Sequence, residues 1–134
     1  MTNKRFFNIF NLTEAEAIEL LDTPLDRLAE DESRYVAASH LINFNTEASI
    51  NALMRAIAND DPELDNRIVR RKSIETLGKL QAKPALPAIR NCLTDSDCYT
   101  VENAVWAIGE IGTEDPVILA EIAKILERSG QNYR

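Results

Sequence analysis

The sequence predicts an all-α fold, a right-handed α-solenoid of HEAT-like helix pairs, and three observations indicate it. Apolar residues recur at helical spacing along the 134-residue chain. The same aliphatic positions return after roughly 31–36 residues, the length of one solenoid repeat. A glycine follows an aliphatic residue near the end of first helices, and a proline opens second helices, as in HEAT repeats. The chain is long enough for a single domain with its own core.

Residues 1–30 are expected to cap the solenoid with short helices. Residues 1–12 are too apolar for a free tail and should pack against the first helices. The apolar side chains of this segment are Phe6, Phe7, Ile9, Phe10 and Leu12. Thr13-Glu-Ala-Glu16 is a capping box, which predicts a helix that continues to about Leu21. Thr23 followed by Pro24 indicates a second short helix, with threonine as its N-cap.

Three similar units are predicted next, over residues 31–60, 65–95 and 97–130, each a helix, a short turn and a helix. The aligned core positions of the first helices are Ala38 and Leu41, Ile74 and Leu77, and Val105 and Ile108. Those of the second helices are Ile50, Leu53, Ala56 and Ile57, then Leu86, Ile89, Cys92 and Leu93, then Leu119, Ile122, Ile125 and Leu126. TPR units have a similar length, but their Trp-Leu-Gly-Tyr pattern is missing, which favours HEAT repeats.

Capping residues and glycines indicate where these helices begin and end. The residues that precede predicted helices are Thr46, and Asp61, Lys83 and Asp115, each of the last three followed by proline. Gly112 and Gly130 are expected just past helix ends, where a left-handed glycine cap is common. The units should therefore consist of discrete helices joined by short turns.

The composition excludes several classes of function. The formal net charge is −7, and an acidic chain is a poor ligand for nucleic acid, because Lys and Arg must neutralise the phosphates. No run of about 18 apolar residues predicts a membrane span, and no secretory signal is evident, so a cytoplasmic setting is expected. One histidine, two cysteines and no phosphate loop or zinc spacing predict neither hydrolase nor kinase chemistry, nor a metal site.

One predicted helix carries an unusual second face, separate from its core stripe. Tyr99, Glu102, Trp106 and Glu110 recur at helical spacing, so two aromatic rings alternate with two carboxylates. The rings offer stacking area, and the carboxylates accept hydrogen bonds from N–H groups. The alternative is that Trp106 packs between neighbouring helices of the solenoid.

A cluster of basic residues and the single histidine are further candidates for a binding site. The cluster in the second unit contains Arg67, Arg70, Arg71 and Lys72. Arginine forks suit carboxylate or phosphate groups, whereas the alternative is a solvated helix face in which Arg71, Glu75 and Lys79 pair along the helix. His40 is either part of a site or a partly buried structural histidine.

Several motifs resemble the HEAT-repeat phycobilin lyases of the E/F type. They are Arg34-Tyr-Val-Ala-Ala-Ser-His-Leu41, Asn66-Arg-Ile-Val-Arg-Arg-Lys72 and Tyr99-Thr-Val-Glu-Asn-Ala-Val-Trp-Ala-Ile-Gly-Glu-Ile-Gly112. The segment Lys4-Arg-Phe-Phe-Asn-Ile-Phe10 is similar to the phycoerythrobilin lyases of that group. The resemblance extends over nearly the whole chain, and the motif that ends at Gly112 is its most specific part.

The resemblance implies a function in the assembly of cyanobacterial or red-algal phycobilisomes. Such lyases attach an open-chain tetrapyrrole, a phycobilin, to a cysteine thiol of a phycobiliprotein subunit through a thioether. The chain would then have no cofactor of its own; the phycobilin would be a bound substrate, and the acceptor protein would supply the nucleophile.

The resemblance also assigns roles to the candidate residues. Glu102 or Glu110 would accept the pyrrole N–H groups or assist proton transfer, and Tyr99 and Trp106 would stack on the bilin. The remaining bilin-binding candidates are Arg70, Arg71 and Lys72, which would pair with the propionates, and His40.

Two alternatives remain open at this point. The chain could be a non-catalytic, chaperone-like scaffold that binds a phycobiliprotein subunit without touching bilin, or a generic HEAT adaptor. Members of the lyase family are usually longer, and the chain stops where a fourth repeat would begin. We therefore expect further HEAT repeats or a second lyase subunit to complete it, over an unsealed face that includes Ile118, Ile122 or Ile125.

Overall fold

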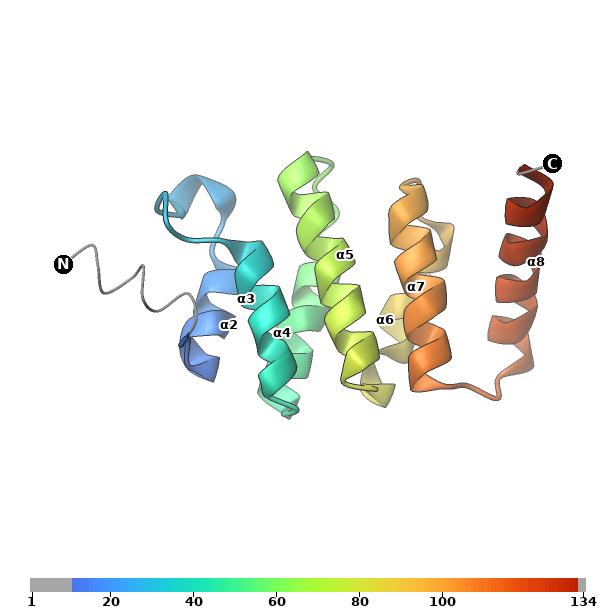
Figure 1. Cartoon of the computed structure of the whole chain (residues 1–134), viewed down its shortest axis with the longest axis horizontal. Coiled ribbons are helices and arrows are strands. Elements are labelled where there is room, and N and C mark those ends of the chain that lie inside the picture. Colours follow the sequence, from blue (N-terminus) through green and yellow to red (C-terminus); the bar gives the residue numbers. More distant parts are fainter. Residues whose placement is uncertain (1–10, 133–134) are drawn as a thin grey trace.

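The computed structural model of the chain describes residues 11–132, with side chains as far as Ser129. Within this range every regular element is a helix or a helical turn, and the helices stand side by side in a row (Figure 1). The fold is therefore an α-solenoid, as predicted. None of the described helices is both long enough and apolar enough to cross a membrane. The packing predicted for Phe6, Phe7, Ile9 and Phe10 lies outside the described residues.

The helices are arranged in two layers (Figure 1). The first helices of the three pairs form the front layer: α3 (Arg34–His40), α5 (Leu64–Lys79) and α7 (Cys98–Ile111). The others are α2 (Glu14–Asp22) at the N-terminal end, α4 (Glu47–Ala58) and α6 (Leu86–Asn91) behind the front layer, and α8 (Pro116–Asn132) at the other end. Helix α3 packs on α5, and α5 packs on α7, so the first helices of three successive repeats present one continuous face.

Short 3₁₀ turns join or extend these helices. They are η1 (Leu25–Arg27), η2 (Leu41–Asn43), η3 (Lys83–Ala85) and η4 (Cys92–Thr94). The second N-terminal helix predicted at Thr23 and Pro24 is only η1, because Leu28 already has an extended backbone with φ −74° and ψ 140°. Thr23 is the C-cap of α2, not an N-cap, and its hydroxyl donates to the Glu19 carbonyl at 2.7 Å.

The predicted N-caps at three helices are present. In the capping box, the Glu16 amide donates to Thr13 Oγ1 and the Thr13 amide donates to Glu16 Oε1, both at 3.1 Å. Thr46 Oγ1 accepts from the Ser49 amide at 3.1 Å at the start of α4. Asp115 Oδ1 accepts from the Val117 amide at 2.9 Å before α8. Each cap satisfies an amide that has no partner within its helix.

The two glycines expected at helix ends behave differently. Gly112 ends α7 with φ +85°, a backbone conformation that favours glycine. Gly130 was expected past the end of the last helix, but α8 continues through it to Asn132. That prediction was wrong because a glycine terminates a helix only when its backbone leaves the helical conformation, and Gly130 keeps it.

The repeated aliphatic positions form the core between the two layers. Leu41, Ile74, Leu77 and Ile108 are at most 1% exposed, as the repeat alignment predicts. A buried hydroxyl adds a polar connection between α5 and α3, since Thr76 Oγ1 donates to the Ala38 carbonyl at 3.0 Å. The shared core holds the front-layer helices in a defined register.

Helix α8 turns a different face inward than the sequence suggested. Ile118 is 6% exposed, and Ile122 and Ile125 are partly buried against the core, so these three residues do not form an unsealed face. Their helical spacing places them on one inward stripe. The exposed stripe contains Leu119 and Leu126, at 49% and 58% exposure, so the prediction that these two residues are core positions was wrong. The expectation that further repeats or a partner subunit complete the solenoid stays a prediction.

Helices α5 and α7 approach closely at a glycine. A Cβ added at Gly78 would lie 2.9 Å from the Cα of Ala107 and 2.9 Å from Cζ3 of Trp106. The repeat alignment places Gly109 of α7 at the equivalent position, yet a Cβ there would meet nothing within 4 Å. Only the first glycine is therefore required by packing.

We expect Gly78→Ala to destabilise the fold by about 1–3 kcal/mol, because backbone atoms of Ala107 cannot move aside without shifting α7. Chemical denaturation measures the change in stability. The fluorescence emission of Trp106, the only tryptophan, should also shift, because the added methyl group displaces its ring. Gly109→Ala is the matched control and should be neutral or stabilising, since alanine favours a helix. Equal effects of the two substitutions would contradict the close approach.

Candidate functional site

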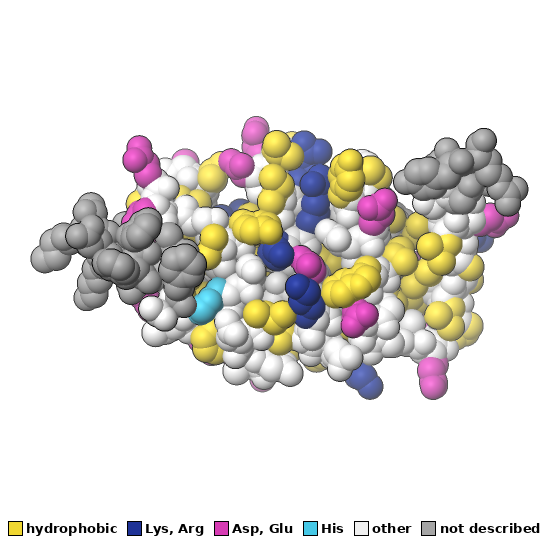
Figure 2. All heavy atoms as spheres, viewed as in Figure 1, with side chains coloured by type: hydrophobic (Ala, Val, Ile, Leu, Met, Phe, Trp, Pro, Cys, Tyr) yellow, Lys and Arg dark blue, Asp and Glu magenta, His cyan; other side chains and the backbone are white. Residues whose placement is uncertain are grey.

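The face formed by α3, α5 and α7, here called the front face, carries an unusual mixture of side chains. Figure 2 shows hydrophobic, basic and acidic side chains alternating across it. Three aromatic rings are exposed on these helices: Tyr35 at 43%, Tyr99 at 58% and Trp106 at 41%. Exposed rings amid paired charges are typical of surfaces that bind a planar ligand or a protein.

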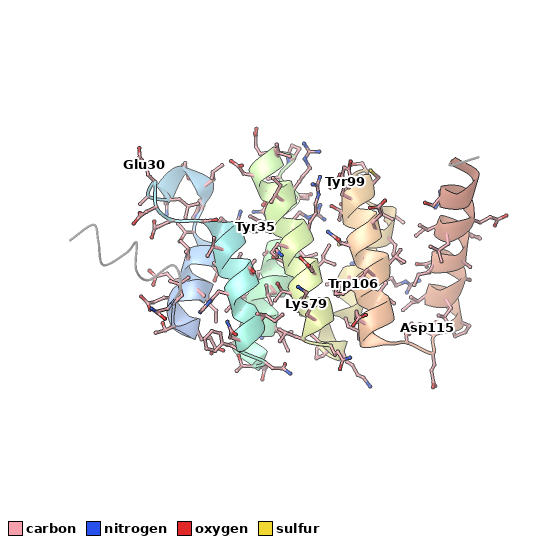
Figure 3. The ribbon with its side chains drawn as sticks, in the orientation of Figure 1. Glu30, Tyr35, Lys79, Tyr99, Trp106 and Asp115 are labelled. Carbon is pink, nitrogen blue, oxygen red and sulfur yellow. The ribbon has the colours of Figure 1, made fainter. Side chains whose placement is uncertain are left out.

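The face predicted on α7 is present and accessible. Glu102 and Glu110 are exposed together with the two rings, whereas Ala104, Ala107 and Ile108 on the opposite side of the helix are buried. In Figure 3, Trp106 projects from α7 toward α5, and Tyr99 lies near the N-terminal end of α7. The Trp106 ring rests against the backbone at Gly78 while much of its surface remains open, so it both packs and faces solvent.

Arg71 connects α5 to the start of α7. Its Nε donates to Asp97 Oδ2 at 2.8 Å, and its guanidinium carbon lies 4.8 Å from the centroid of the Tyr99 ring. The Thr100 hydroxyl donates to the same carboxylate oxygen at 2.7 Å. Arg71 thus holds the Tyr99 ring by a cation–π contact, and its predicted pairing with Glu75 is absent because Asp97 takes its place.

The pKa values of two carboxyls beside these arginines are lowered. Burial raises the pKa of Asp97, but hydrogen bonds from Arg71 and Thr100 outweigh it. Burial likewise raises the pKa of Asp95, and the backbone amide of Asp97 and the Arg70 guanidinium outweigh it. Both groups are therefore held as carboxylates in the folded chain.

These shifts predict a specific acid sensitivity. Because the pKa of Asp97 is lower in the folded chain, its carboxylate stabilises the fold at pH values above the pKa of an unfolded aspartate, about 4. This stabilisation is lost as the pH falls through the pKa of Asp97 in the folded chain. Thermal unfolding between pH 7 and pH 3 should show a steeper loss for the wild type than for Asp97→Asn, which lacks the titrating group. Parallel pH profiles would contradict the assignment.

Arg70 is not available to a ligand, which corrects its assignment as a bilin-binding residue. It is 9% exposed. Its Nε donates to the Ile57 carbonyl at 2.9 Å, and its Nη1 donates to Asp95 Oδ2 at 2.8 Å. The side chain points between α4 and η4, away from the front face, because position 70 is on the core side of α5. Arg70 therefore connects two successive repeats by hydrogen bonds to the Ile57 carbonyl and to Asp95.

Lys72 belongs to a cluster on the α3 side of α5. Its Nζ donates to Glu75 at 2.7 Å and lies 5.1 Å from the centroid of the Tyr35 ring. Lys79 also pairs with Glu75, at 3.3 Å. Burial lowers the pKa of Lys72, but the Glu75 carboxylate and Tyr35 outweigh it and raise it. Lys72 and Arg71 thus face different neighbouring helices, so the structure does not bring them together.

His40 lies apart from the α7 residues. It ends α3, and α5 lies between α3 and α7. Its Nε2 is 2.6 Å from the Leu12 carbonyl, and its ring centroid is 5.6 Å from that of Phe44. These contacts agree with the alternative that His40 is a partly buried structural histidine. Its Nε2–H donates to the Leu12 carbonyl and is therefore not available to a ligand.

A cavity of about 690 Å³ was not anticipated from the sequence. It lies between the turn after α2 and the N-terminal ends of α3 and α5, in the size range of small-molecule sites. Its lining includes Tyr35, Leu25 and Ile68, and the carboxyl residues Asp22, Asp26, Glu32, Asp61, Glu63 and Asp65. The acidic composition of residues 60–65 was the only signal, since three distant segments form the walls.

Arg34 is the basic residue in the lining of this cavity. Its Nε donates to the Leu21 carbonyl at 2.9 Å, and its Nη1 donates to Asn66 Oδ1 at 3.3 Å. Burial lowers the pKa of Arg34, against the opposing charge of Asp22. Among the described residues, no group of three His, Cys, Asp or Glu side chains is placed to hold a metal ion.

Comparison with known proteins defines the class of this protein. Residues 63–127 match the HEAT-repeat family, in agreement with the stacked helix pairs. The chain is thus a HEAT-repeat protein.

Two relatives specify the family further. The chain is 67% identical over 132 residues, 98% of its length, to "Uncharacterized phycocyanin operon protein Y" of Pseudanabaena tenuis (strain PCC 7409). It is 33% identical over 103 residues, 75% of its length, to "Bilin biosynthesis protein CpeY" of Synechococcus sp. (strain WH8020). The chain belongs to the HEAT-repeat phycobilin lyase family of the E/F type, as the motifs indicated. The aligned parts are 31% and 24% of these relatives, so the chain spans less than a third of their length.

Proposed function

We propose that the chain binds an open-chain tetrapyrrole and, as part of a phycobilin lyase, helps to attach it to a cysteine of a phycobiliprotein subunit. The observation that carries the proposal is the α7 face, where the exposed rings of Tyr99 and Trp106 alternate with the exposed carboxylates of Glu102 and Glu110. The name of one relative, a bilin biosynthesis protein, supports it.

The dimensions of this face suit an extended conjugated ligand. Tyr99 and Trp106 are two helical turns apart, about 10 Å along the helix axis. Both rings lie on the same side of α7, so one long ligand can stack on both. A carboxylate between the rings can accept hydrogen bonds from pyrrole N–H groups, which a purely apolar face would leave without partners.

The role of the chain in attachment would be positioning. The thiol of the acceptor cysteine adds across a carbon–carbon double bond of the ring-A side chain; a C–S bond forms, and the proton from the thiol ends on the bilin. No group leaves, so a site needs only to hold the bilin and the thiol together and move a proton. Glu102 or Glu110 can transfer that proton, and the exposed position of both allows an acceptor protein to approach.

A scaffold that binds a phycobiliprotein subunit without contacting bilin is the second candidate. The exposed Tyr35, Tyr99 and Trp106 favour it, because tyrosine and tryptophan are enriched at protein interfaces. It differs from the first candidate in requiring no direct contact between this chain and the chromophore.

Absorption spectroscopy with free phycobilin tests the proposal. Binding should shift and sharpen the visible band and quench the fluorescence of Trp106, the only tryptophan. Glu102→Gln should weaken the spectral change, whereas Glu127→Gln, at an exposed position of α8, should leave it unchanged. An unchanged spectrum combined with capture of a phycobiliprotein subunit would favour the scaffold and contradict direct bilin binding.

A further inference from the structure

Three arginines on two successive turns of α5 have different surroundings. Arg70 and Arg71 each form an ion pair at 2.8 Å, with Asp95 and Asp97 respectively. The side chain of Arg67 forms no hydrogen bond or ion pair within the described residues, and its Nε is buried without a partner. One of the three positive charges is therefore uncompensated.

The surroundings of Arg67 make that charge an unusual feature. The residue is partly buried, and arginine remains charged at every physiological pH. A buried donor that has lost its water and gained no acceptor destabilises the fold. The Nε itself is enclosed by the protein, whereas the two terminal nitrogens of the guanidinium are not among the enclosed atoms. An anion that accepts from these terminal nitrogens would compensate the charge, so the unpaired guanidinium points to an anionic ligand beside it.

The neighbours of Arg67 indicate the kind of anion. Arg67 and Arg71 are four residues apart and share one side of α5. Figure 2 shows basic side chains gathered along the boundary between the upper halves of α5 and α7, bordered by hydrophobic side chains. The cation–π contact of Arg71 holds the Tyr99 ring on this same boundary. A planar conjugated group on the ring and an anionic arm at Arg67 would thus be adjacent.

A single negative charge fits better than a phosphate dianion. Of the three arginines, only Arg67 is uncompensated within the part of the chain that the structure describes. Two carboxylates are also nearby, since Asp95 follows η4 and Asp97 precedes α7. A carboxylate also matches the planar fork of a guanidinium, which can donate two parallel hydrogen bonds to it.

We propose that Arg67 binds a carboxylate of a planar conjugated ligand in the boundary between α5 and α7, next to Tyr99. The inference rests on the proposed function, in which the ligand is a bilin and the carboxylate is one of its propionates. Arg67 then replaces Arg70 as the residue that recognises the propionate, while Arg71 orients the ring. In the absence of ligand, the unpartnered Nε of Arg67 does not stabilise the fold.

Binding of a bilin diacid and of its dimethyl ester separates the carboxylate from the rest of the ligand. The wild type should bind the diacid about 10-fold to 100-fold more tightly, the range expected for a charge-assisted hydrogen bond. Arg67→Met should reduce this ratio to near one while still binding both compounds. Arg55→Met is the matched control, since it removes an exposed arginine of α4 that pairs with Asp22, and it should keep the wild-type ratio.

The ratio decides the inference separately from the proposed function. If both compounds bind and Arg67→Met keeps the wild-type preference for the diacid, the carboxylate site is wrong and bilin binding stands. If neither compound binds, the proposed function fails, and titration of propionate against the Arg67 Nε–H NMR signal decides the site alone. A saturable shift of that signal, which Arg67→Met identifies by its loss, would uphold the site, and an unchanged signal would overturn it.

Thermal unfolding of the ligand-free variants gives a further readout. Arg67→Met should have an unfolding midpoint equal to or above that of the wild type, because it removes an uncompensated charge. A midpoint clearly below the wild-type value would assign Arg67 to the stability of the fold and overturn the proposal. Arg67→Lys keeps the charge without the fork and should retain part of the preference for the diacid.

Discussion

Arg70→Met should destabilise the fold by about 3–5 kcal/mol, the cost of breaking a largely buried ion pair from one side. The side chains of Arg70 and Asp95 are 11% and 17% exposed, so solvent compensates little for the lost partner. The substitution leaves the Asp95 carboxylate without its counter-charge and the Ile57 carbonyl without its donor. Because these groups lie in neighbouring repeats, the loss should loosen the contact between them.

Urea denaturation of the two variants measures this effect. Arg55→Met is again the control, since its ion pair with Asp22 spans a similar distance, 3.0 Å, but the side chains are 55% and 40% exposed. Exposed pairs contribute about 0–1 kcal/mol, so this variant should remain close to the wild type. Similar losses of stability in both variants would show that burial does not make the Arg70 ion pair more important than an exposed one.

Leu77→Ala and Ile108→Ala should each destabilise the fold by about 2–5 kcal/mol. The two residues hold the same position in successive repeats and are 0% and 1% exposed. Truncation leaves a cavity between layers that cannot collapse, because the helices on both sides are held by further core contacts. Leu126→Ala, at a 58% exposed position of α8, should change stability little. Denaturation midpoints unchanged from the wild type would show that the repeat alignment is wrong.

The α7 face could be predicted because it depends on a single helix. The spacing of Tyr99 and Trp106 places both rings on one side, and the aliphatic stripe of Ala104 and Ile108 occupies the other. No contact with another segment is needed for this division. The exposure of both rings follows from this division of the helix. The contact of Trp106 with Gly78 does not, because that contact depends on the approach of a second helix.

The roles of the arginines could not be predicted in the same way. The sequence grouped Arg67, Arg70, Arg71 and Lys72 by their proximity in the chain. In the structure their partners are Asp95, Asp97 and Glu75. Asp95 lies at the end of the same repeat, and Asp97 opens the next one. A helical wheel shows which way a side chain points but not which acid it meets, so only the packing of α5 on α7 separates the paired arginines from Arg67.

The cavity beside Arg34 illustrates the same limit. Its walls come from the turn after α2 and from the ends of α3 and α5, and no local pattern reports that these segments meet. The inward face of α8 is a smaller case. The sequence showed that Ile118 and Ile122 share a stripe, but which stripe faces the core depends on the angle at which α8 leaves the turn after Gly112.

By itself, the sequence determined most of the helices, their caps at Thr13 and Thr46, the repeat and the family, because these follow from local hydrogen bonding and the periodicity of apolar residues. Only the tertiary structure decided which charges are neutralised, where a cavity opens and which glycine is indispensable. These properties depend on atoms that are distant in the chain and approach within hydrogen-bonding or van der Waals distance only after the helices have packed.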